Sequence, residues 1–248
     1  MSFAGVLFDK DGTLVDFQRT WGPATFRAME ILAAGDPLAV ERQARALHYS
    51  MAKQAFLKTS PLIAGSSATY AEIWAEALGR TDVAALRREI DALTAIEALK
   101  FLTPIGDPRA VLSSLKALGL RLGVATNDSE ASARRQLAAL GIDDLVEFVA
   151  GYDSGHGGKP DPGMVEAFAR ALNAEPNEVA LVGDATHDLD AAKAAGATAI
   201  AVLSGPADRA TLEPHADHVV DDISRLPDLL QSLSRRSQTS AYSAAKGR

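Results

Sequence analysis

The chain has 248 residues, of which 47% are hydrophobic and 23% are charged, a composition typical of a globular protein with a sizeable core. No apolar run approaches the roughly 20 residues that a membrane-spanning helix needs, and the first residues lack the basic and apolar stretches of a signal peptide. The absence of cysteine excludes disulfides, thiolate nucleophiles and cysteine-based zinc sites, and the cytoplasm is the expected compartment.

The formal net charge of −7 argues against a protein that binds nucleic acid. Residues 234–248 carry four cations (Arg235, Arg236, Lys246 and Arg248) and no acid, so removing them leaves −11 for the rest of the chain. An anionic substrate would therefore need local cations, such as a metal ion or a few placed Lys or Arg side chains. Residues 234–248 are small and polar and are expected to form a disordered basic tail.

In chain order, residues 3–8 predict a strand, because an apolar run ends there in charge and glycine. Residues 17–97 then show apolar side chains at helical spacing, with turn signals between the groups and no convincing strand. The apolar positions at this spacing include Ala44, Leu47, Met51, Tyr70, Ile73 and Trp74. We expect residues 17–97 to form a helical domain inserted after the first strand.

From residue 103 onward the pattern alternates between helix and strand. Predicted helices lie at 107–118, 130–140, 163–172, 188–195 and 224–233. Predicted strands lie at 120–125, 148–149, 179–182, 198–202 and 218–220. Strands that alternate with helices of this length indicate a parallel sheet with right-handed crossovers. The expected fold class is α/β: a doubly wound parallel sheet from residues 1–16 and 98–233, with the helical domain inserted.

Polar signatures follow three of the predicted strands: Asp9-Lys10-Asp11-Gly12-Thr13, Thr126-Asn127-Asp128, and Gly183-Asp184 with Asp188 after it. A carboxylate at the edge of a core needs a cation or hydrogen-bond donors, and ligands bind at the carboxyl ends of parallel strands. Lys159 lies in a loop rich in glycine and proline and could be aimed at the same edge. Each signature alone is explained by a turn or a helix N-cap, so their joint occurrence favours a site.

The acidic residues of these signatures favour a magnesium site. Asp9, Asp11 and Asp184 offer the oxygen ligands that Mg²⁺ prefers, and Mg²⁺ usually keeps several waters. His156 and His187 lack the spacing of a histidine metal site. The acidic pattern also lacks the alternating third ligand and the late Glu of an EF-hand.

The signatures, in this order, resemble those of the haloacid dehalogenase superfamily of phosphohydrolases, over essentially residues 1–233. The insertion at 17–97 resembles the helical cap of its phosphoglycolate phosphatase and β-phosphoglucomutase branch. This resemblance implies a Rossmann-like catalytic core and a Mg²⁺-dependent phosphatase that acts through an aspartyl-phosphate intermediate. The implied substrate is a small phosphorylated metabolite, either phosphoglycolate-like or a sugar phosphate.

By matching position, the resemblance implies that Asp9 is the nucleophile and that Asp11 protonates the leaving alcohol and then activates water. It implies that Thr126, Asn127 and Lys159 hold the phosphoryl oxygens. The implied metal ligands are Asp9, Asp11 (through its carbonyl), Asp184 and Asp188.

Asp11 also bears on the reaction type. Halide leaves without a proton, and dehalogenases of the superfamily lack an acid at this position, so Asp11 favours phosphate esters. A sugar-phosphate mutase of the same branch is an alternative. A catalytically idle binding or regulatory protein is another, disfavoured because Asp9 and Asp11 are both present.

Substrate selection is expected to come from side chains that the cap lowers over the pocket. The candidates are Arg19, Trp21, Arg45, His48 and Lys53 in the insertion, and His156 and His187 beside the signatures. Each candidate also has an ordinary interpretation as a packing residue or a solvated surface residue. No membrane or nucleic-acid partner is expected, and both a monomer and a homodimer are compatible with the sequence.

Overall fold

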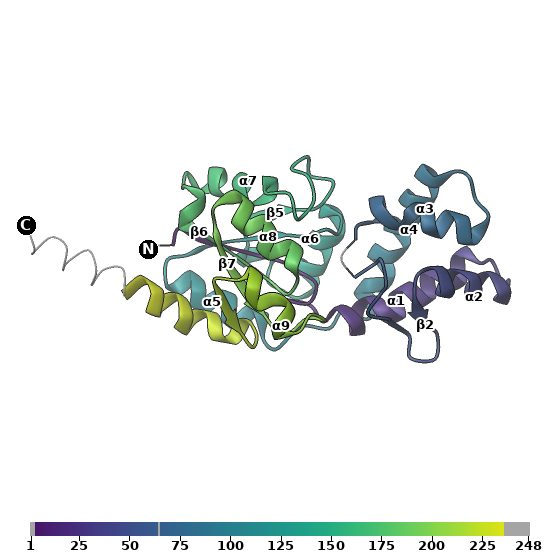
Figure 1. Ribbon diagram of the computed structural model, residues 1–248, viewed down its shortest axis with the longest axis horizontal. Helices are drawn as coiled ribbons and strands as arrows, with labels where there is room; N and C mark the ends of the chain where they lie inside the picture. The colour runs from purple at the N-terminus through teal and green to yellow at the C-terminus, as the bar shows by residue number, and fades with distance from the viewer. Residues whose placement is uncertain (1–2, 64, 236–248) are drawn as a thin grey trace, which may run out of the picture.

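The protein is described here by a computed structural model that covers residues 3–63 and 65–235. Figure 1 shows a sheet with helices on both faces and, beside this layered part, a group of helices formed by residues 17–100. No helix in the described ranges has the length and apolar character needed to cross a bilayer. Of the tail predicted at 234–248, residues 236–248 lie outside the described residues, whereas Ser234 and Arg235 belong to a final helix at 226–235.

Six parallel strands form the main sheet, in the order β5-β4-β1-β6-β7-β8. Their bounds are β1 (Gly5–Phe8), β4 (Arg121–Ala125), β5 (Phe148–Ala150), β6 (Val179–Gly183), β7 (Thr198–Val202) and β8 (His218–Val220). Phe8 at the end of β1 pairs in register with Val124 of β4 and Val182 of β6, so these three strands end at one level. The predicted doubly wound α/β fold is confirmed.

The helices of this part are α5 (Pro108–Ala117), α6 (Glu130–Ala139), α7 (Gly163–Leu172), α8 (Thr186–Ala195) and α9 (Arg209–Leu212). Short 3-10 turns lie at η1 (Asp143–Leu145), η2 (Pro176–Glu178), η3 (Glu213–His215) and η4 (Ile223–Arg225). The predicted strands and helices from residue 103 onward agree with these elements to within two residues at each end. Local chemistry explains the agreement: Asp107 and Ser129, for example, accept backbone N–H bonds at the starts of α5 and α6.

The central strand β1 contributes to the apolar core on both faces of the sheet. Because strand side chains alternate, Val6 and Phe8 belong to a buried cluster with residues of α5, α6 and the final helix. Leu7 belongs to a second cluster that includes Phe168 of α7 and Leu189 of α8. All four residues of β1 are buried, as expected for a central strand between two helical layers.

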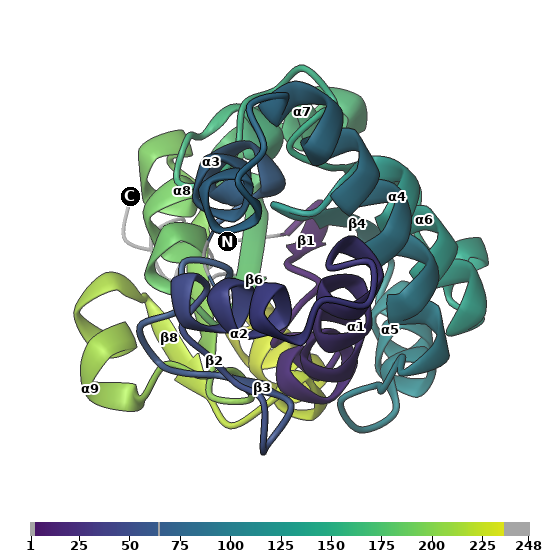
Figure 2. The same ribbon diagram turned by 90° about the vertical axis from the view of Figure 1, so that its right-hand side faces the viewer.

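A separate apolar cluster holds together α1 (Phe17–Leu32), α2 (Pro37–Ala46), α3 (Ser67–Leu78) and α4 (Val83–Lys100). Trp74 is its largest fully buried side chain. Figure 2, seen from the side of these helices, shows them in front of strands β1, β4 and β6.

The expectation that no strand interrupts residues 17–97 is wrong. Strands β2 (Tyr49–Ser50) and β3 (Ala55–Phe56) form a short antiparallel hairpin. Helix α2 ends at Ala46, and His48 has a φ of 49°, in the left-handed region that breaks a helix. The side chains at 47 and 49 are buried all the same, whereas Met51 is exposed. The apolar residues on the two sides of this turn are spaced as they would be in a helix, which explains the wrong expectation.

Candidate active site

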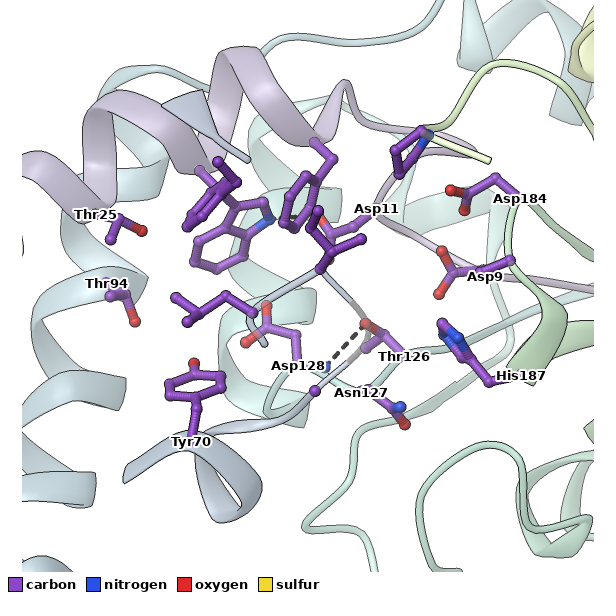
Figure 3. Close-up of a pocket in the computed structure, with 18 of the residues that line it drawn as sticks. Asp9, Asp11, Thr25, Tyr70, Thr94, Thr126, Asn127, Asp128, Asp184 and His187 are labelled. Carbon is purple, nitrogen blue, oxygen red and sulfur yellow. Dashed lines mark hydrogen bonds between the residues drawn. The ribbon is translucent and has the colours of Figure 1, made fainter. Parts of the chain in front are cut away.

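The polar residues that follow β1, β4 and β6 meet at one edge of the sheet, facing helices α1, α3 and α4. A pocket of about 790 Å³, its open mouth included, lies between them. Figure 3 shows Asp9 and Asp184 close together on one side of this pocket, with Thr25, Tyr70 and Thr94 on the opposite side.

Lys159 is buried at the centre of the polar edge and binds two carboxylates. Its Nζ lies 2.5 Å from Asp9 Oδ1 and 2.6 Å from Asp188 Oδ1, and it also donates to the carbonyl of Ala125 at 2.9 Å. Burial alone would lower the pKa of Lys159, but the charges of Asp188 and Asp9 outweigh it and raise that pKa. The ammonium is therefore a fixed positive charge beside Asp9.

Asp9, Asp184 and Asp188 form a buried group whose ligand oxygens lie within 4.8 Å of one another. Burial raises the pKa of Asp9 to about 7 despite the opposing charge of Lys159. Burial, reinforced by the two neighbouring carboxylates, also raises the pKa of Asp184. One ammonium thus faces three carboxylates, and a divalent cation with oxygen ligands would balance the excess charge. This donor set fits the predicted Mg²⁺.

Glycines bring the backbone close to Asp184. Gly12 has a φ of +89°, and a Cβ there would lie 2.2 Å from Asp184 Oδ2. A Cβ on Gly205, in the loop after β7, would lie 1.8 Å from the same oxygen. Thr13 Oγ1 donates to Asp184 Oδ1 at 3.3 Å, and Ser204 Oγ donates to the carbonyl of Gly12 at 2.7 Å. The loops after β1 and β7 therefore close around this carboxylate.

The Asp11 carboxylate is not a member of the buried group of three carboxylates described above. Its Oδ1 accepts from the indole N–H of Trp21 at 2.6 Å, and its Oδ2 lies 2.6 Å from Lys10 Nζ. Trp21 belongs to α1, so the side chain predicted as the general acid contacts both the signature loop and the inserted helices. Asp11 and Trp21 both line the pocket.

Lys10 is fully buried between the signature loop and α6. Besides Asp11, it lies 3.3 Å from Asp128 Oδ2 and donates to Gln136 Oε1 at 2.9 Å, and its Nζ is 5.0 Å from the centre of the Trp21 ring. Burial raises the pKa of Asp128 even though Lys10 opposes it. Neither Lys10 nor Asp128 was predicted as a site residue, although both stand inside the signatures.

The signature after β4 fixes the Lys159 loop. Asn127 Nδ2 donates to the carbonyl of Lys159 at 3.0 Å, and the Lys159 N–H donates to Asn127 Oδ1 at 2.9 Å. Thr126 is buried in the pocket lining, and its Oγ1 accepts from the N–H of Asp128 at 3.1 Å, the bond drawn in Figure 3. The Asn127 side chain thus clamps the loop, a role that the sequence did not suggest.

Two of the predicted specificity residues line the pocket, and the others do not. Trp21 and His187 line the pocket, and burial lowers the pKa of His187. The remaining candidates lie outside the lining: Arg19, Arg45, His48 and Lys53 are exposed, and His156 stacks on Phe148. The exposed group includes every Lys and Arg predicted for this purpose.

The wall of the pocket opposite the carboxylates is largely apolar and was not predicted. It includes Phe17, Phe56, Leu62, Ile63, Tyr70 and Trp74. Tyr70 and Trp74 were recognised by their helical spacing, which places them on one face of α3 but does not distinguish a core face from a pocket wall.

Comparisons with known proteins agree with this arrangement. A family model described as haloacid dehalogenase-like hydrolase matches residues 3–196. A phosphoglycolate phosphatase of Rhodospirillum rubrum is 33% identical over 236 residues, which cover 91% of this chain and 90% of that protein. A hydrolase from Pseudomonas syringae is similar in structure (TM-score 0.64, 24% identity, covering 94% and 98% of the two chains). A β-phosphoglucomutase from Clostridium difficile is similar too (TM-score 0.61, 17% identity, covering 90% and 93%). The two structural likenesses bear on the fold alone.

Proposed function

Because the chain belongs to the haloacid dehalogenase-like hydrolases, we propose that it is a Mg²⁺-dependent phosphatase that works through an aspartyl-phosphate on Asp9. Its enzyme class is that of a phosphoric monoester hydrolase, and its substrate is a small phosphorylated metabolite. The observation that carries the mechanism is the placement of Asp9. It ends the central strand beside the Lys159 ammonium, in one buried group with Asp184 and Asp188.

In the first step an Asp9 carboxylate oxygen attacks phosphorus, and the bond from phosphorus to the alcohol oxygen breaks. Asp11 gives a proton to that oxygen, so the alcohol leaves neutral. In the second step Asp11 takes a proton from water, whose oxygen attacks the phosphorus of the aspartyl-phosphate and frees Asp9. Trp21 and Lys10 orient Asp11 through the contacts at 2.6 Å.

Phosphoryl transfer depends mostly on positioning and charge stabilisation. Lys159, the Thr126 hydroxyl and the Asn127 N–H would hold the phosphoryl oxygens. Bound at Asp9, Asp184 and Asp188, and at the carbonyl of Asp11, Mg²⁺ would supply positive charge to the carboxylates and the phosphoryl group.

We further propose that residues 17–97 form a cap over a catalytic core made of 1–16 and 98–233. Two observations support this division. The inserted helices have their own apolar cluster, and they meet the core at Tyr152, which accepts from Ser67 Oγ and donates to Asp91.

Hydrolysis is favoured over the mutase and over an idle protein. A mutase that turns over a sugar phosphate needs hydrogen-bond partners for several hydroxyls, and the wall opposite Asp9 is mainly apolar. An idle protein has no need of a carboxylate nucleophile and a second carboxylate held in place beside it.

The test compares wild type with Asp9→Asn on p-nitrophenyl phosphate and Mg²⁺. We expect kcat to fall by about three orders of magnitude or more, because the covalent nucleophile is removed. Circular dichroism and the unfolding midpoint would check that the variant is folded. Equal activity of a folded variant would contradict the mechanism, and activity that EDTA leaves unchanged would contradict the metal requirement.

A further inference from the structure

The pocket has two chemically different halves, and the second half bears on the substrate. The phosphate half contains Asp9, Asp184 and Thr126 at the sheet edge. The half that would face the organic part of a substrate comes from α1, the β2–β3 hairpin, the following loop, α3 and α4. Its apolar side chains are Phe17, Trp21, Phe56, Leu62, Ile63 and Trp74.

No Lys or Arg occurs among the described residues that line this pocket. Arg19, Arg45 and Lys53 of the inserted region are exposed and lie outside the lining. Lys10 and Lys159 are fully buried and already paired with carboxylates. A carboxylate on the organic part of a substrate would therefore lose water without gaining a cation, which is strongly unfavourable.

The uncharged polar groups of the wall are few, and the charged groups beside it are the carboxylates of Asp11 and Asp128, both paired with Lys10. Thr94 Oγ1 donates to the carbonyl of Ile90 at 2.8 Å and retains lone pairs, and the Thr25 and Tyr70 hydroxyls belong to residues that also line the pocket. These three side chains are labelled on the far side of the pocket in Figure 3. Three hydroxyls can serve one or two polar atoms of a ligand, but they would leave most hydroxyls of a sugar without partners.

Both indoles in the wall have their N–H groups engaged. Trp21 Nε1 donates to Asp11 at 2.6 Å, and Trp74 Nε1 donates to Gln43 Oε1 at 2.6 Å. Trp21 therefore offers a ligand only ring surface, whereas Trp74 is fully buried and backs the same wall. Aromatic surface of this kind binds apolar groups, and aromatic rings in particular.

We propose that the substrate is a phosphate monoester of an uncharged, predominantly apolar alcohol that carries an aromatic ring. This inference rests on the proposed function for the phosphate half of the site, and it names the substrate class. It differs from the substrate printed in the name of the Rhodospirillum rubrum relative.

Turnover provides the first test. Wild type with Mg²⁺ would be assayed on benzyl phosphate, phosphoglycolate and glucose 6-phosphate, which all release primary alcohols, so that only the organic part differs. We expect kcat/KM for benzyl phosphate to exceed both others by about tenfold or more. A preference for phosphoglycolate or glucose 6-phosphate would overturn the inference and leave the phosphatase function standing.

Binding provides a test that does not depend on turnover. Benzylphosphonate and phosphonoacetate share the phosphonomethyl group and differ only in phenyl against carboxylate. We expect benzylphosphonate to bind about tenfold or more tightly by calorimetry. If no ester is turned over and benzylphosphonate still binds better, the proposed function fails and the inference about the wall stands. Tighter phosphonoacetate binding would overturn the inference.

A charge placed in the wall should reverse the preference. Ile63→Lys puts a cation on a half-buried lining residue, and Leu57→Lys adds the same charge on a residue that is 50% exposed and outside the lining. We expect Ile63→Lys to raise kcat/KM for phosphoglycolate relative to benzyl phosphate by about tenfold or more, and Leu57→Lys to leave the ratio unchanged. A ratio that Ile63→Lys does not move would contradict the role given to this wall.

Discussion

Lys10 belongs to the loop of residues 9–13 that follows β1, and its ammonium is buried beneath the site, away from water. Its ammonium binds Asp11 and Asp128 and donates to Gln136, and its side chain is not exposed at all. A buried charge is tolerated only when it is paired and hydrogen-bonded, and removing one partner strands the others. Lys10 thus stabilises the loop on which Asp11 stands.

Lys10→Met keeps the length of the side chain and removes its charge. We expect the free energy of unfolding to fall by about 3–5 kcal/mol, because two carboxylates lose their buried cation. Urea unfolding measures the change. Lys116→Met is the matched control, because Lys116 and its partner Glu147 are each 37% exposed and Arg121 also binds Glu147, so little change is expected. An unchanged stability of Lys10→Met would show that the buried pairs contribute nothing net.

At the scale of elements, two hydrogen bonds between the Asn127 side chain and the backbone of Lys159 join the loop after β4 to the Lys159 loop. Asn127→Ala removes both bonds but keeps the backbone N–H proposed to bind phosphate. We expect kcat to fall by about 10–100-fold, because Lys159 loses its fixed position. Asn127→Asp keeps the acceptor for the Lys159 N–H and should fall in between. Steady-state kinetics on p-nitrophenyl phosphate checks the order, and equal losses in the two variants would contradict the clamp.

The start of α6 and the loop after β5 are joined through Glu130. Its Oε2 accepts from Ser154 Oγ at 2.6 Å, Arg134 binds its other oxygen, and these bonds lower the pKa of Glu130 below its usual 4.5. A carboxyl whose pKa is lowered on folding stabilises the protein fully above its unfolded pKa. That contribution is lost as the pH falls through the lowered folded pKa.

Glu130→Gln therefore has a pH-dependent effect. At pH 7 we expect the free energy of unfolding to fall by at most about 1 kcal/mol, since the side chain is partly exposed and screened. Well below the usual pKa of 4.5 the difference from wild type should disappear, because both side chains are then uncharged. Thermal unfolding across the acid range measures it, and a difference that grows as the pH falls would contradict the assigned sign.

Much of the element scale could be predicted from the sequence, because strands and helices from residue 103 onward carry strong periodicity and explicit caps. The β2–β3 hairpin could not be, because each strand has two residues and its stability comes from contacts across the fold. Tyr49 donates its hydroxyl hydrogen to the carbonyl of Gly22, and the Phe56 N–H donates to Gln18 Oε1. Neither partner is near in sequence.

For the molecule as a whole, parallel-sheet topology brings the strand-end signatures together, so the placement of Asp9, Lys159 and Asp184 could be anticipated. The opposite wall could not. Whether Arg19 or Trp21 faces the pocket depends on how α1 is rotated against the core, which the local sequence does not encode. Of the candidates in the insertion, the cations are exposed and only Trp21 lines the pocket, together with aromatic residues that were not predicted to do so.

The excess of carboxylates over ammonium at the sheet edge also sets a whole-molecule property. Mg²⁺ that binds only the folded chain raises the unfolding midpoint by mass action, so Mg²⁺ should raise Tm relative to EDTA. Because burial raises the pKa of Asp9 to about 7, protons compete with the metal, and the apparent affinity for Mg²⁺ should rise between about pH 6 and pH 8. Thermal unfolding titrations measure both effects.

Two variants serve as controls for the metal prediction. Asp184→Asn removes a carboxylate from the buried group and should abolish most of the Mg²⁺-dependent rise in Tm. Asp143→Asn makes the same change at an exposed residue outside that group and should keep the full rise. A rise of equal size in both variants would place the metal elsewhere.

The two indoles of the apolar wall have one more consequence, which concerns light. The chain contains two tryptophans in all, and both Trp21 and Trp74 line the pocket. When tryptophan is excited selectively at the long-wavelength end of protein absorbance, all of the fluorescence therefore comes from residues of this one wall. Binding of a ligand in the pocket can therefore be followed in real time by tryptophan fluorescence, without an added label.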